Sequence, residues 1–388
     1  MVSLLRKNIL GLQHLIAMFG ATTLVPLLTG LDVSVTLFAA GVGTLIFHFL
    51  TERKVPVFLG SSFAFIPGII AIGATSGLQY AQGGIVVAGI LYLLFSFLVY
   101  KIGIKTINKY LPKYVVGAII TIIGLMLIPV AIDMSMTKIS IAATVFLFSI
   151  FIMFFTNGFS RQLVILLTII FGYGISLLVG EIAFEGVREA SWLTIPNFTF
   201  PKFNFYAISI LAPVVLATFM EHIGDITANG QVVGKNFIKD PGLHKTLLGD
   251  GIATAFAGMI GGPANTTYSE NTGVLAVTEN YNPEILRIAA VFAIILSFIE
   301  KIAAVLNTIP VFVLGGVSLL LFGMIAKIGL DTIYIDKSWK NLPKVITVLI
   351  MWIIAFGNLN FWVFSSLSLA AIAGILLNFI FVHIGLVK

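Results

Sequence analysis

Apolar runs of roughly 17 to 25 residues recur along nearly the whole chain, separated by short polar breaks. A helix needs about 20 apolar residues to cross the hydrocarbon core of a bilayer, so runs of this length predict transmembrane helices. Hydrophobic residues make up 59% of the 388 and the mean hydropathy is +1.09, which excludes an ordinary soluble domain. The first run is too long for the apolar part of a cleavable signal peptide. The sequence therefore predicts an all-α polytopic membrane protein.

We expect 14 membrane segments, with boundaries uncertain by a few residues. They cover residues 8–29, 32–50, 56–73, 82–100, 114–132, 138–156, 161–180, 205–227, 244–261, 263–278, 286–306, 309–326, 342–357 and 360–386. If the amino terminus is cytoplasmic, all but four of the 22 Lys and Arg residues lie in cytoplasmic connections, the exceptions being Lys138, Arg188, Lys202 and Lys301. This bias follows the positive-inside rule, and it supports both the count and cytoplasmic N- and C-termini.

The basic residues also indicate which partners to expect. The net charge of +6 lies mostly on the predicted cytoplasmic connections, so we expect membrane lipids rather than nucleic acid as the partner of this surface. Lys101, Lys105, Lys109 and Lys113 recur at every fourth position and predict a short amphipathic helix whose lysines reach anionic headgroups. The chain has no cysteine, which excludes disulfides and thiolate metal ligands, and we expect neither a metal nor a cofactor.

A loop at roughly 181–204 divides the chain into two halves of seven predicted segments each. An odd number of segments places the second half upside down relative to the first, so the halves are predicted to be inverted repeats. The third segment of each half is interrupted, and reads VPVFLGSSFAFIPG at 55–68 and GGPANTTYSENTG at 261–273. Short segments interrupted by Gly and Pro at corresponding positions of two halves point to the binding site of a transporter.

Extended backbone cannot face lipid, because its N–H and C=O groups would lack hydrogen-bond partners. We therefore expect the interrupted segments, the third and the tenth, to be short strands that pair with each other. Each strand would lead into a half-helix that begins near Ser62 or Ser269. The first-turn N–H groups would then point at the bilayer centre and suit carbonyl oxygens or a partial anion. The alternative is a pair of kinked but continuous helices.

Among the acidic residues of the predicted membrane segments, we single out three as candidates for the site. Glu221 and Asp225 are four residues apart and therefore share one face of a helix, and Glu270 lies on the interrupted tenth segment. An acid at the centre of a membrane helix costs about 3 kcal/mol on insertion scales, so these residues are functional candidates by default. His14 is a weaker candidate, since a lone histidine often pairs with a neighbouring helix. Asp250 is expected near the cytoplasmic end of its span, in a structural role.

Several motifs resemble those of a known family, the nucleobase/ascorbate transporters that include the xanthine and uracil permeases. The resemblance covers essentially the whole chain, through LQHLIAMFGATTLVP (12–26), VPVFLGSSFAFI (55–66), EHIGD (221–225), KDPGLHKTLLGDGIAT (239–254), GGPANTTYSENTGVLAVT (261–278) and LGGVSLLLFGMI (314–325). The family signature is present as Glu270, Asn271, Gly273 and Thr278. The bacterial uracil permease branch is the most similar.

The resemblance implies a fold of 14 segments in two inverted sevens, in a multi-pass protein of the cytoplasmic (inner) membrane of a bacterium, commonly a homodimer. It also implies two domains, each built from both halves. The core domain would consist of segments 1–4 (residues 1–103) and 8–11 (residues 205–307). The gate domain would consist of segments 5–7 (residues 104–204) and 12–14 (residues 308–388).

The same resemblance assigns roles to individual residues. Glu221 and Glu270 would accept hydrogen bonds from the N–H groups of a base, and the backbone N–H groups of Phe63 and Ser269 would donate to its carbonyl oxygens. Phe63 and Tyr268 would lie beside the base. The remaining expected site residues are Ala21, close to the substrate, and the proton-coupling residues Glu221, Asp225 and His14.

We therefore expect a proton-coupled symporter, and not an enzyme, that imports a nucleobase by alternating access. Uracil is favoured, because Glu rather than Gln at position 270 resembles the uracil branch of the family more than the purine branch. The two N–H donors and two carbonyl acceptors of uracil also complement carboxylates and free backbone N–H groups. Two departures leave alternatives open, since Asp225 stands where some uracil permeases have His, and Glu279 follows the signature where Arg, Lys or Gly is common. The alternatives are a xanthine or purine permease, and an anion exchanger of related architecture, which the acids disfavour.

Overall fold

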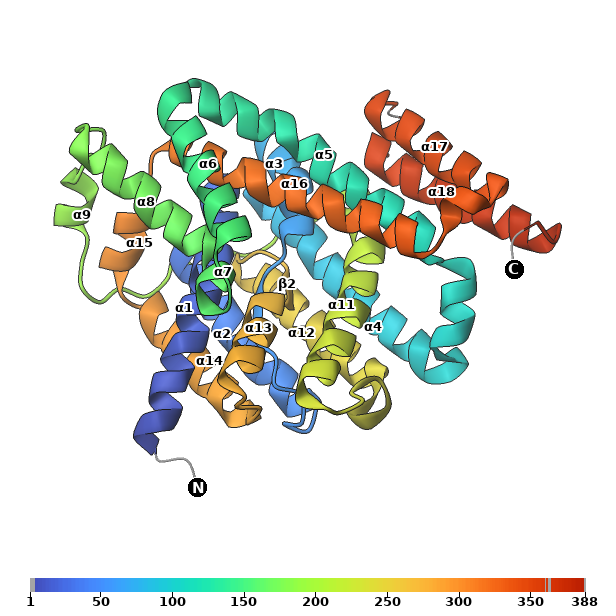
Figure 1. The fold of residues 1–388 in the computed structure, drawn as a ribbon, viewed down its shortest axis with the longest axis horizontal. Helices are drawn as coiled ribbons and strands as arrows, with labels where there is room; N and C mark the ends of the chain where they lie inside the picture. Colours follow the sequence, from blue (N-terminus) through green and yellow to red (C-terminus); the bar gives the residue numbers. More distant parts are fainter. Residues whose placement is uncertain (1–3, 360, 362–363, 387–388) are drawn as a thin grey trace.

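The computed structural model describes residues 4–359, 361 and 364–386 (Figure 1). The helices before the central loop are α1 (Leu4–Thr29), α2 (Val33–Leu50), α3 (Ile66–Thr75), α4 (Leu78–Tyr110), α5 (Lys113–Met136), α6 (Ile139–Phe155), α7 (Phe159–Gln162) and α8 (Val164–Leu178), and α9 (Glu185–Glu189) lies within the loop. Those after it are α10 (Phe205–Leu211), α11 (Val214–Val233), α12 (Leu243–Ile260), α13 (Ser269–Thr278), α14 (Pro283–Ser297), α15 (Glu300–Asn307), α16 (Val311–Ile335), α17 (Leu342–Phe356) and α18 (Ser366–His383).

Among the described residues, seven helical segments are long and apolar enough to cross a membrane. They are α1, α2, α4, α5, α10 with α11, α16 and α18, and the bent pair α14 with α15 brings the number to eight. Four further apolar helices of 10 to 17 residues lie between them. The prediction of a helical, multi-pass membrane protein is thus confirmed. The last predicted segment began at residue 360, but residues 360, 362 and 363 lie outside the described part, and its helix begins at Ser366.

Two predicted segments are not regular helices along their whole length. The eighth segment is divided into α10 and α11 at Ala212 and Pro213, because proline has no N–H to continue the helical hydrogen bonds. The eleventh segment bends by 79° between α14 and α15. There the backbone N–H of Thr194, in the central loop, donates to the carbonyl oxygen of Phe298, and Glu300 accepts a hydrogen bond from the Thr194 hydroxyl. The loop thus satisfies polar groups at the bend.

At both interrupted segments the backbone is extended for three residues. Strand β1 (Leu59–Ser61) pairs antiparallel with β2 (Asn265–Thr267), and Gly60 lies opposite Thr266. Two more hydrogen bonds extend this pairing, from Ser62 N to the Ala264 oxygen (2.8 Å) and from Tyr268 N to the Phe58 oxygen (3.0 Å). Both strands are fully buried, so each satisfies the other's polar backbone within the protein. A 3-10 turn, η1 (Phe63–Phe65), leads from β1 into α3, whereas β2 leads into α13 directly.

The helices pack in pairs that relate one half of the chain to the other. The contact of α4 with α12 has its counterpart, between the two halves, in the contact of α14 with α2. In the same way, the contact of α10 with α4 has its counterpart in the contact of α1 with α14. Likewise α6 packs on α16 and α17 on α5, while α6 pairs with α8 and α17 with α18. Figure 1 shows α5 and α16 running side by side, with the α17 and α18 pair at one end of the molecule. This exchange of equivalent partners is the packing expected of two inverted repeats.

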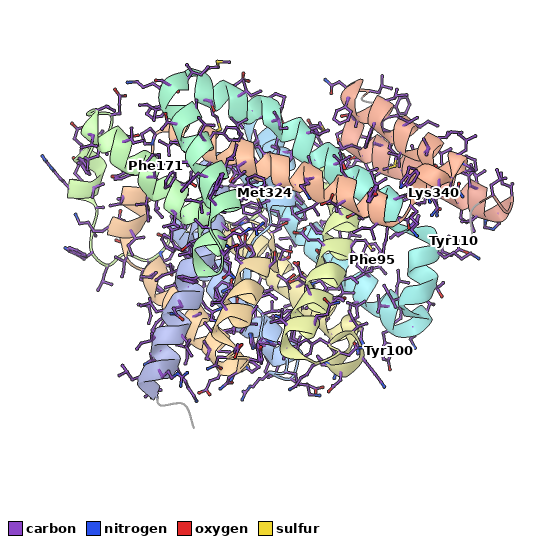
Figure 2. All side chains as sticks on the ribbon, viewed as in Figure 1. Phe95, Tyr100, Tyr110, Phe171, Met324 and Lys340 are labelled. Carbon is purple, nitrogen blue, oxygen red and sulfur yellow. The ribbon has the colours of Figure 1, made fainter. Side chains whose placement is uncertain are left out.

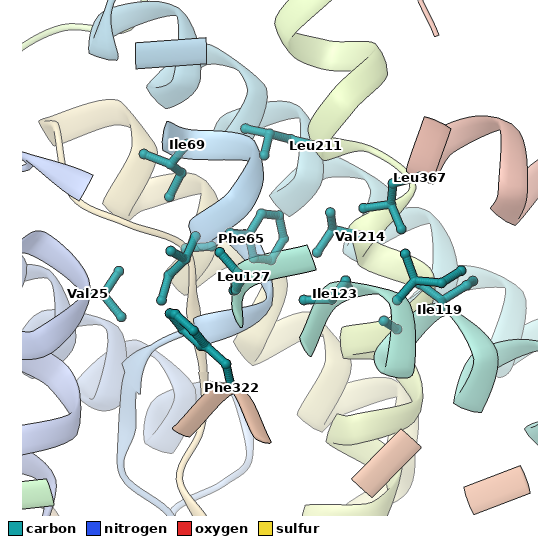
Figure 3. Close-up of a cluster of buried hydrophobic side chains, with 14 of the residues drawn as sticks. Val25, Phe65, Ile69, Ile119, Ile123, Leu127, Leu211, Val214, Phe322 and Leu367 are labelled. Atoms are coloured by element: carbon teal, nitrogen blue, oxygen red, sulfur yellow. The ribbon is translucent and has the colours of Figure 1, made fainter. Parts of the chain in front are cut away.

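The largest apolar cluster joins the regions predicted as core and gate (Figure 3). Phe65, Ile69 and Val214 come from segments of the predicted core, whereas Ile123 and Phe322 come from α5 and α16 of the predicted gate. All five side chains are almost completely buried. The contact between them consists of aliphatic and aromatic groups without directional bonds, so it holds the two regions together through buried apolar area.

Candidate functional site

A cavity of about 710 Å³ opens where the two strand and helix segments meet α11. Its other wall is formed by α5, α7, α8 and α16, so both halves of the chain contribute to it. Met324 of α16, labelled in Figure 2, is one of the lining residues. Most of the predicted site residues line this cavity, namely Phe63, Glu221, Asp225, Tyr268, Ser269 and Glu270.

Three carboxyl groups face the cavity. Glu221 and Asp225 lie one turn apart on α11, and the Glu221 side chain is exposed to the cavity while that of Asp225 is half-buried. Asp225 Oδ2 accepts a hydrogen bond of 2.8 Å from the hydroxyl of Thr267, the last residue of β2. Glu270 is the second residue of α13, where the partial positive charge of a helix N-terminus favours an anionic or hydrogen-bond-accepting group. The fold thus brings together acids that lie 45 residues apart in the sequence (Asp225 to Glu270).

Two backbone donors adjoin these acids. Phe63 is the first residue of η1 and Ser269 the first residue of α13, and the N–H groups of a first helical turn have no acceptor within their own helix. The preceding N–H groups, of Ser62 and Tyr268, are both engaged in the strand pairing. The strands therefore position in the cavity wall the N–H groups of Phe63 and Ser269, for which the described part of the chain supplies no acceptor.

Two aromatic rings form one side of the site. The rings of Phe63 and Tyr268 are almost parallel, at 22°, with centroids 6.4 Å apart. The Tyr268 hydroxyl donates to the Ser61 oxygen at 2.9 Å, which ties the ring to the opposite strand. A Cβ atom on Gly60 would lie 2.4 Å from Cζ of Tyr268, so only glycine leaves room for this ring. The orientation of Tyr268 is thus fixed by β1.

Two of the predicted residues do not line the cavity. His14 is buried in α1, where the Asn271 side-chain nitrogen donates to its backbone oxygen at 2.9 Å and lies 3.1 Å from its Nδ1. Ala21, about two helical turns further along α1, is buried in an apolar cluster that also contains Tyr268. His14 therefore contacts the site indirectly, through Asn271 of α13, and Ala21 lies in the cluster that packs around the Tyr268 ring.

A buried polar pair adjacent to Glu221 was missed in the sequence. His222 Nδ1 lies 2.9 Å from Asp250 Oδ2, its Nε2 lies 2.9 Å from the Thr246 hydroxyl, and all three side chains are fully buried. The prediction that Asp250 lies near the end of its span is wrong, because it occupies the middle of α12. The sequence signal that could have indicated this pair is a His and an Asp in two apolar membrane segments. Only the fold shows that these two helices face each other.

The cavity has a second unpredicted feature, on the wall formed by α7. Gln162, at the end of α7, lines the cavity, and its side-chain oxygen is enclosed without a hydrogen-bond partner among the described residues. A Cβ atom on Gly273 would lie 2.5 Å from Gln162 Nε2, so the amide packs directly on the glycine of the signature. Gly273 lies one turn after Glu270. Gln162 therefore lies over the helix face next to that acid.

Comparisons with known proteins identify the family of the chain. The profile of the Permease family matches residues 6–361. A probable uracil permease of Haemophilus influenzae is 42% identical over 395 aligned residues, which cover 97% of this chain and 95% of that protein. The uracil permease of Bacillus subtilis is 39% identical, covering 95% and 91%, and that of Escherichia coli K12 is 35% identical, covering 99% and 93%.

Solved structures of lower sequence identity share the fold. The structure of SLC26A9 superposes with a TM-score of 0.72 at 11% identity, covering 98% of this chain and 66% of that one. The transmembrane domain of the cyanobacterial bicarbonate transporter BicA superposes with a TM-score of 0.61 at 14% identity, covering 97% and 98%. These likenesses show an inverted-repeat transporter fold and nothing of the substrate. Together with the family profile and the full-length relatives, they show that the chain is a transporter of the xanthine and uracil permease family.

Proposed function

We propose that the protein is a proton-coupled symporter that imports uracil across the cytoplasmic membrane of a bacterium. The observation that carries this proposal is the cavity itself, which combines carboxylate acceptors, unengaged backbone donors and two aromatic rings in one place. A cavity of about 710 Å³ is within the usual range for small-molecule sites. The relatives described as uracil permeases, which are similar over nearly their full length, support the same substrate.

Uracil matches these groups in number and in polarity. Its two N–H groups would donate to Glu221 and Glu270, and its two carbonyl oxygens would accept from the backbone N–H groups of Phe63 and Ser269. The flat ring would lie beside the side chains of Phe63 and Tyr268. Cytosine has no hydrogen on N3 and would leave one carboxylate facing a lone pair, and an unpaired buried polar group costs about 1–3 kcal/mol. The site is therefore expected to bind uracil more tightly than cytosine.

Proton coupling is assigned to the acids of the same cavity. Glu221 and Asp225 are the leading proton carriers, and His14, which contacts α13 through Asn271, is the third candidate. Moving one positive charge across 100 mV is worth about 2.3 kcal/mol. One proton per neutral base would thus support about fiftyfold accumulation.

Transport would proceed by motion of a core domain against a gate domain. The core consists of residues 1–103 and 205–307, and the gate of residues 104–204 and 308–388. The proposed 14 segments are the eight helical segments that are long and apolar enough to cross a membrane, with α14 and α15 taken as one, the four shorter apolar helices, and α12 and α13. We further propose a homodimer with both termini in the cytoplasm.

The cavity supports an inward-facing state. Besides the acids, its lining includes Lys113, Arg161 and Thr332, which lie at helix ends that the charge bias places on the cytoplasmic side. The base would leave for the cytoplasm through the part of the cavity that lies between Glu221 and these residues. The outward-facing state would require the core to move relative to α5, α7 and α16.

Two other functions remain as alternatives. A xanthine or purine permease would use the same cavity, and the glutamate at position 270 argues for uracil over the purines. An anion exchanger is suggested only by the fold of SLC26A9 and BicA. Against it, Glu221, Asp225 and Glu270 would repel an anion from the cavity.

The test is substrate binding and uptake by the purified, reconstituted protein. In thermal unfolding with a panel of bases, a ligand at a hundred times its Kd should stabilise the protein by about 2.7 kcal/mol. We expect uracil to stabilise it, and cytosine, xanthine and bicarbonate to do so much less. In proteoliposomes, uptake of labelled uracil should require an inward proton gradient. Stabilisation by xanthine but not uracil, or uptake without a proton gradient, would contradict the proposal.

A further inference from the structure

A second cavity, of about 280 Å³, lies between α1 and α14, apart from the substrate site. Figure 1 shows these two helices side by side near the amino terminus, and they pack against each other. The helices approach closely at Gly11, where a Cβ atom would lie 2.7 Å from Cγ2 of Ile288. One turn before Gly11, Asn8 lines the cavity together with Arg287. The groove is therefore polar at the end where both helices begin and apolar further along α14.

The polar end carries more positive than negative charge, since Lys7, Arg53 and Arg287 surround the single carboxylate of Glu284. Nη1 of Arg287 is enclosed and has no hydrogen-bond partner among the described residues. Glu284, which also lines the cavity, is engaged by Lys7 at 2.5 Å. Arg53 lies close enough to act electrostatically on Arg287, and in the described part of the chain neither arginine takes part in an ion pair. An enclosed guanidinium nitrogen without an acceptor is a hydrogen-bond donor free to bind a group from outside the chain.

The wall beyond this polar end is apolar and faces outward. Val291 and Phe292 line the cavity, and Val291 is exposed, as are Ile9 on α1 and Ile295 further along α14. The charge bias of the connections places the polar end on the cytoplasmic side of the membrane. A cationic group at the headgroup level above an apolar, outward-facing groove has the polarity profile of a phospholipid.

We propose that this groove binds an anionic phospholipid of the cytoplasmic leaflet. Its phosphate would accept hydrogen bonds from the guanidinium of Arg287 and from the side-chain amide of Asn8, and one acyl chain would lie along Val291. Arginine suits phosphate because its planar guanidinium can donate two parallel hydrogen bonds. Basic pockets between membrane helices on the cytoplasmic side are a recognised mode of headgroup binding. The bound lipid would hold α1, which carries His14, against α14.

The test measures lipid retention and thermal stability of the full-length protein. Purified protein is titrated with phosphatidylglycerol or phosphatidylcholine in detergent, and bound lipid is counted by native mass spectrometry. The variants are Arg287→Gln, which removes the charge, and Asn8→Asp, which adds a repelling carboxylate while Arg287 remains. Arg188→Gln, an equal loss of charge on exposed α9, is the matched control.

Phosphatidylglycerol, but not phosphatidylcholine, should stabilise the wild-type protein and the Arg188→Gln control. Loss of one positive charge at the surface is worth about 1 kcal/mol, so Arg287→Gln should retain phosphatidylglycerol about fivefold more weakly. Asn8→Asp should weaken it in the same direction. Equal retention of the two lipids, or unchanged retention in both variants, would overturn the proposal. An equal shift with inorganic phosphate or glycerol phosphate alone would also overturn it, since the site would then bind small anions and not lipid.

Discussion

At the scale of single residues, the site depends on acids that the fold places in one cavity. Glu221, Asp225 and Glu270 each carry a cost of insertion into the membrane, and they share a space lined by apolar side chains such as Met220 and Ile325. A hydrogen bond from Thr267 fixes one of them. Such a grouping is difficult to explain as helix packing alone, because packing would distribute the acids among separate partners.

Replacement of Glu221 by Gln tests the acid that is most exposed to the cavity. A hydrogen bond to a charged group is worth about 1.5–3 kcal/mol, so uracil affinity should fall about tenfold or more, and proton-driven uptake should be lost. Uracil binding and uptake in proteoliposomes measure both effects. Glu189→Gln, on exposed α9, is the control and should behave as the wild type. Full proton-dependent uptake by Glu221→Gln would show that this acid carries neither role.

The buried pair of His222 and Asp250 should contribute to stability. His222→Ala removes the hydrogen-bond partner of the fully buried Asp250 carboxyl, and a buried polar group left in this way costs about 1–3 kcal/mol. We expect thermal unfolding to show this loss. Since the two residues contact each other, the double variant His222→Ala and Asp250→Ala should lose less than the sum of the single variants. Additive losses would mean that the pair does not act as a unit.

At the scale of elements, the two short strands are what makes the site possible. Their pairing consumes the backbone groups up to Ser62 and Tyr268 and leaves the next N–H on each side unengaged. The pairing requires close approach at Gly60, whose neighbour across the sheet, Thr266, also lines the cavity. The strands thus set the position of both the donors and the aromatic rings.

Gly60→Ala tests this close approach. The added methyl group would lie within 2.4 to 2.6 Å of the Tyr268 ring and the Thr22 hydroxyl, and the ring is held by its hydrogen bond to Ser61. Overpacking of this kind costs about 1–3 kcal/mol, so stability and uracil affinity should both fall. Gly323→Ala in α16 is the control, because nothing lies within 4 Å of the added atom. Uracil affinity equal in the two variants would show that the Tyr268 ring can move freely.

The loop after α2 provides a pH-dependent contact with a distant element. Hydrogen bonds from Lys245 and Lys54 lower the pKa of the Glu52 carboxyl from 4.5 to about 2. Lys54 also pairs with Asp240 at 2.7 Å, so this cluster joins the loop to the start of α12. A lowered pKa in the folded state means that the contact stabilises the protein above about pH 4.5, and that the contribution is lost as the pH falls toward 2.

Glu52→Gln should therefore be less stable than the wild type at neutral pH, by a small amount because the pair is solvent-exposed. The difference should shrink as the pH is lowered from about 5 to about 3. Thermal unfolding at a series of pH values measures this. Glu189→Gln provides the control for loss of an exposed carboxyl elsewhere. A difference between wild type and Glu52→Gln that grows on acidification would contradict the assignment.

At the scale of the whole molecule, the fold consists of two halves that exchange equivalent contacts, with the site between them. The cavity wall on one side belongs to the proposed core, and on the other to α5, α7, α8 and α16 of the proposed gate. Gln162 and Gly273 form one of the contacts between the two regions. If transport moves the core against the gate, this contact must change during each cycle.

A cross-link between positions 162 and 273 tests that motion. A Cβ atom at position 273 would lie 3.1 Å from Cγ of Gln162, which is close enough for a disulfide between introduced cysteines. The natural chain contains no cysteine, so the pair Gln162→Cys and Gly273→Cys would be unique. Oxidation should abolish uracil uptake, and reduction should restore it relative to the single-cysteine controls. Full uptake by the cross-linked protein would exclude a relative movement of α7 and α13.

The sequence predicted the elements of this fold well where a local rule applied. Apolar length located the membrane helices, and the Gly and Pro residues around Gly60 and Pro263 indicated the interrupted segments. The break at Pro213 could have been read from the same rule, whereas the 79° bend between α14 and α15 has no such local signal. There the central loop supplies the hydrogen bonds, and a contact across more than 100 residues cannot be read from periodicity.

The sequence by itself determined that the chain crosses a membrane many times, that two segments are interrupted, and which acids are candidates for the site. These properties follow from local composition and from the cost of burying charge and unpaired backbone in lipid. The pairing of the two strands was expected from the sequence, but only the tertiary structure decided its register, with Gly60 opposite Thr266, and that His222 faces Asp250 and Gln162 lies on Gly273. Such contacts depend on how helices from the two halves are placed against each other, and a polar side chain does not specify its distant partner.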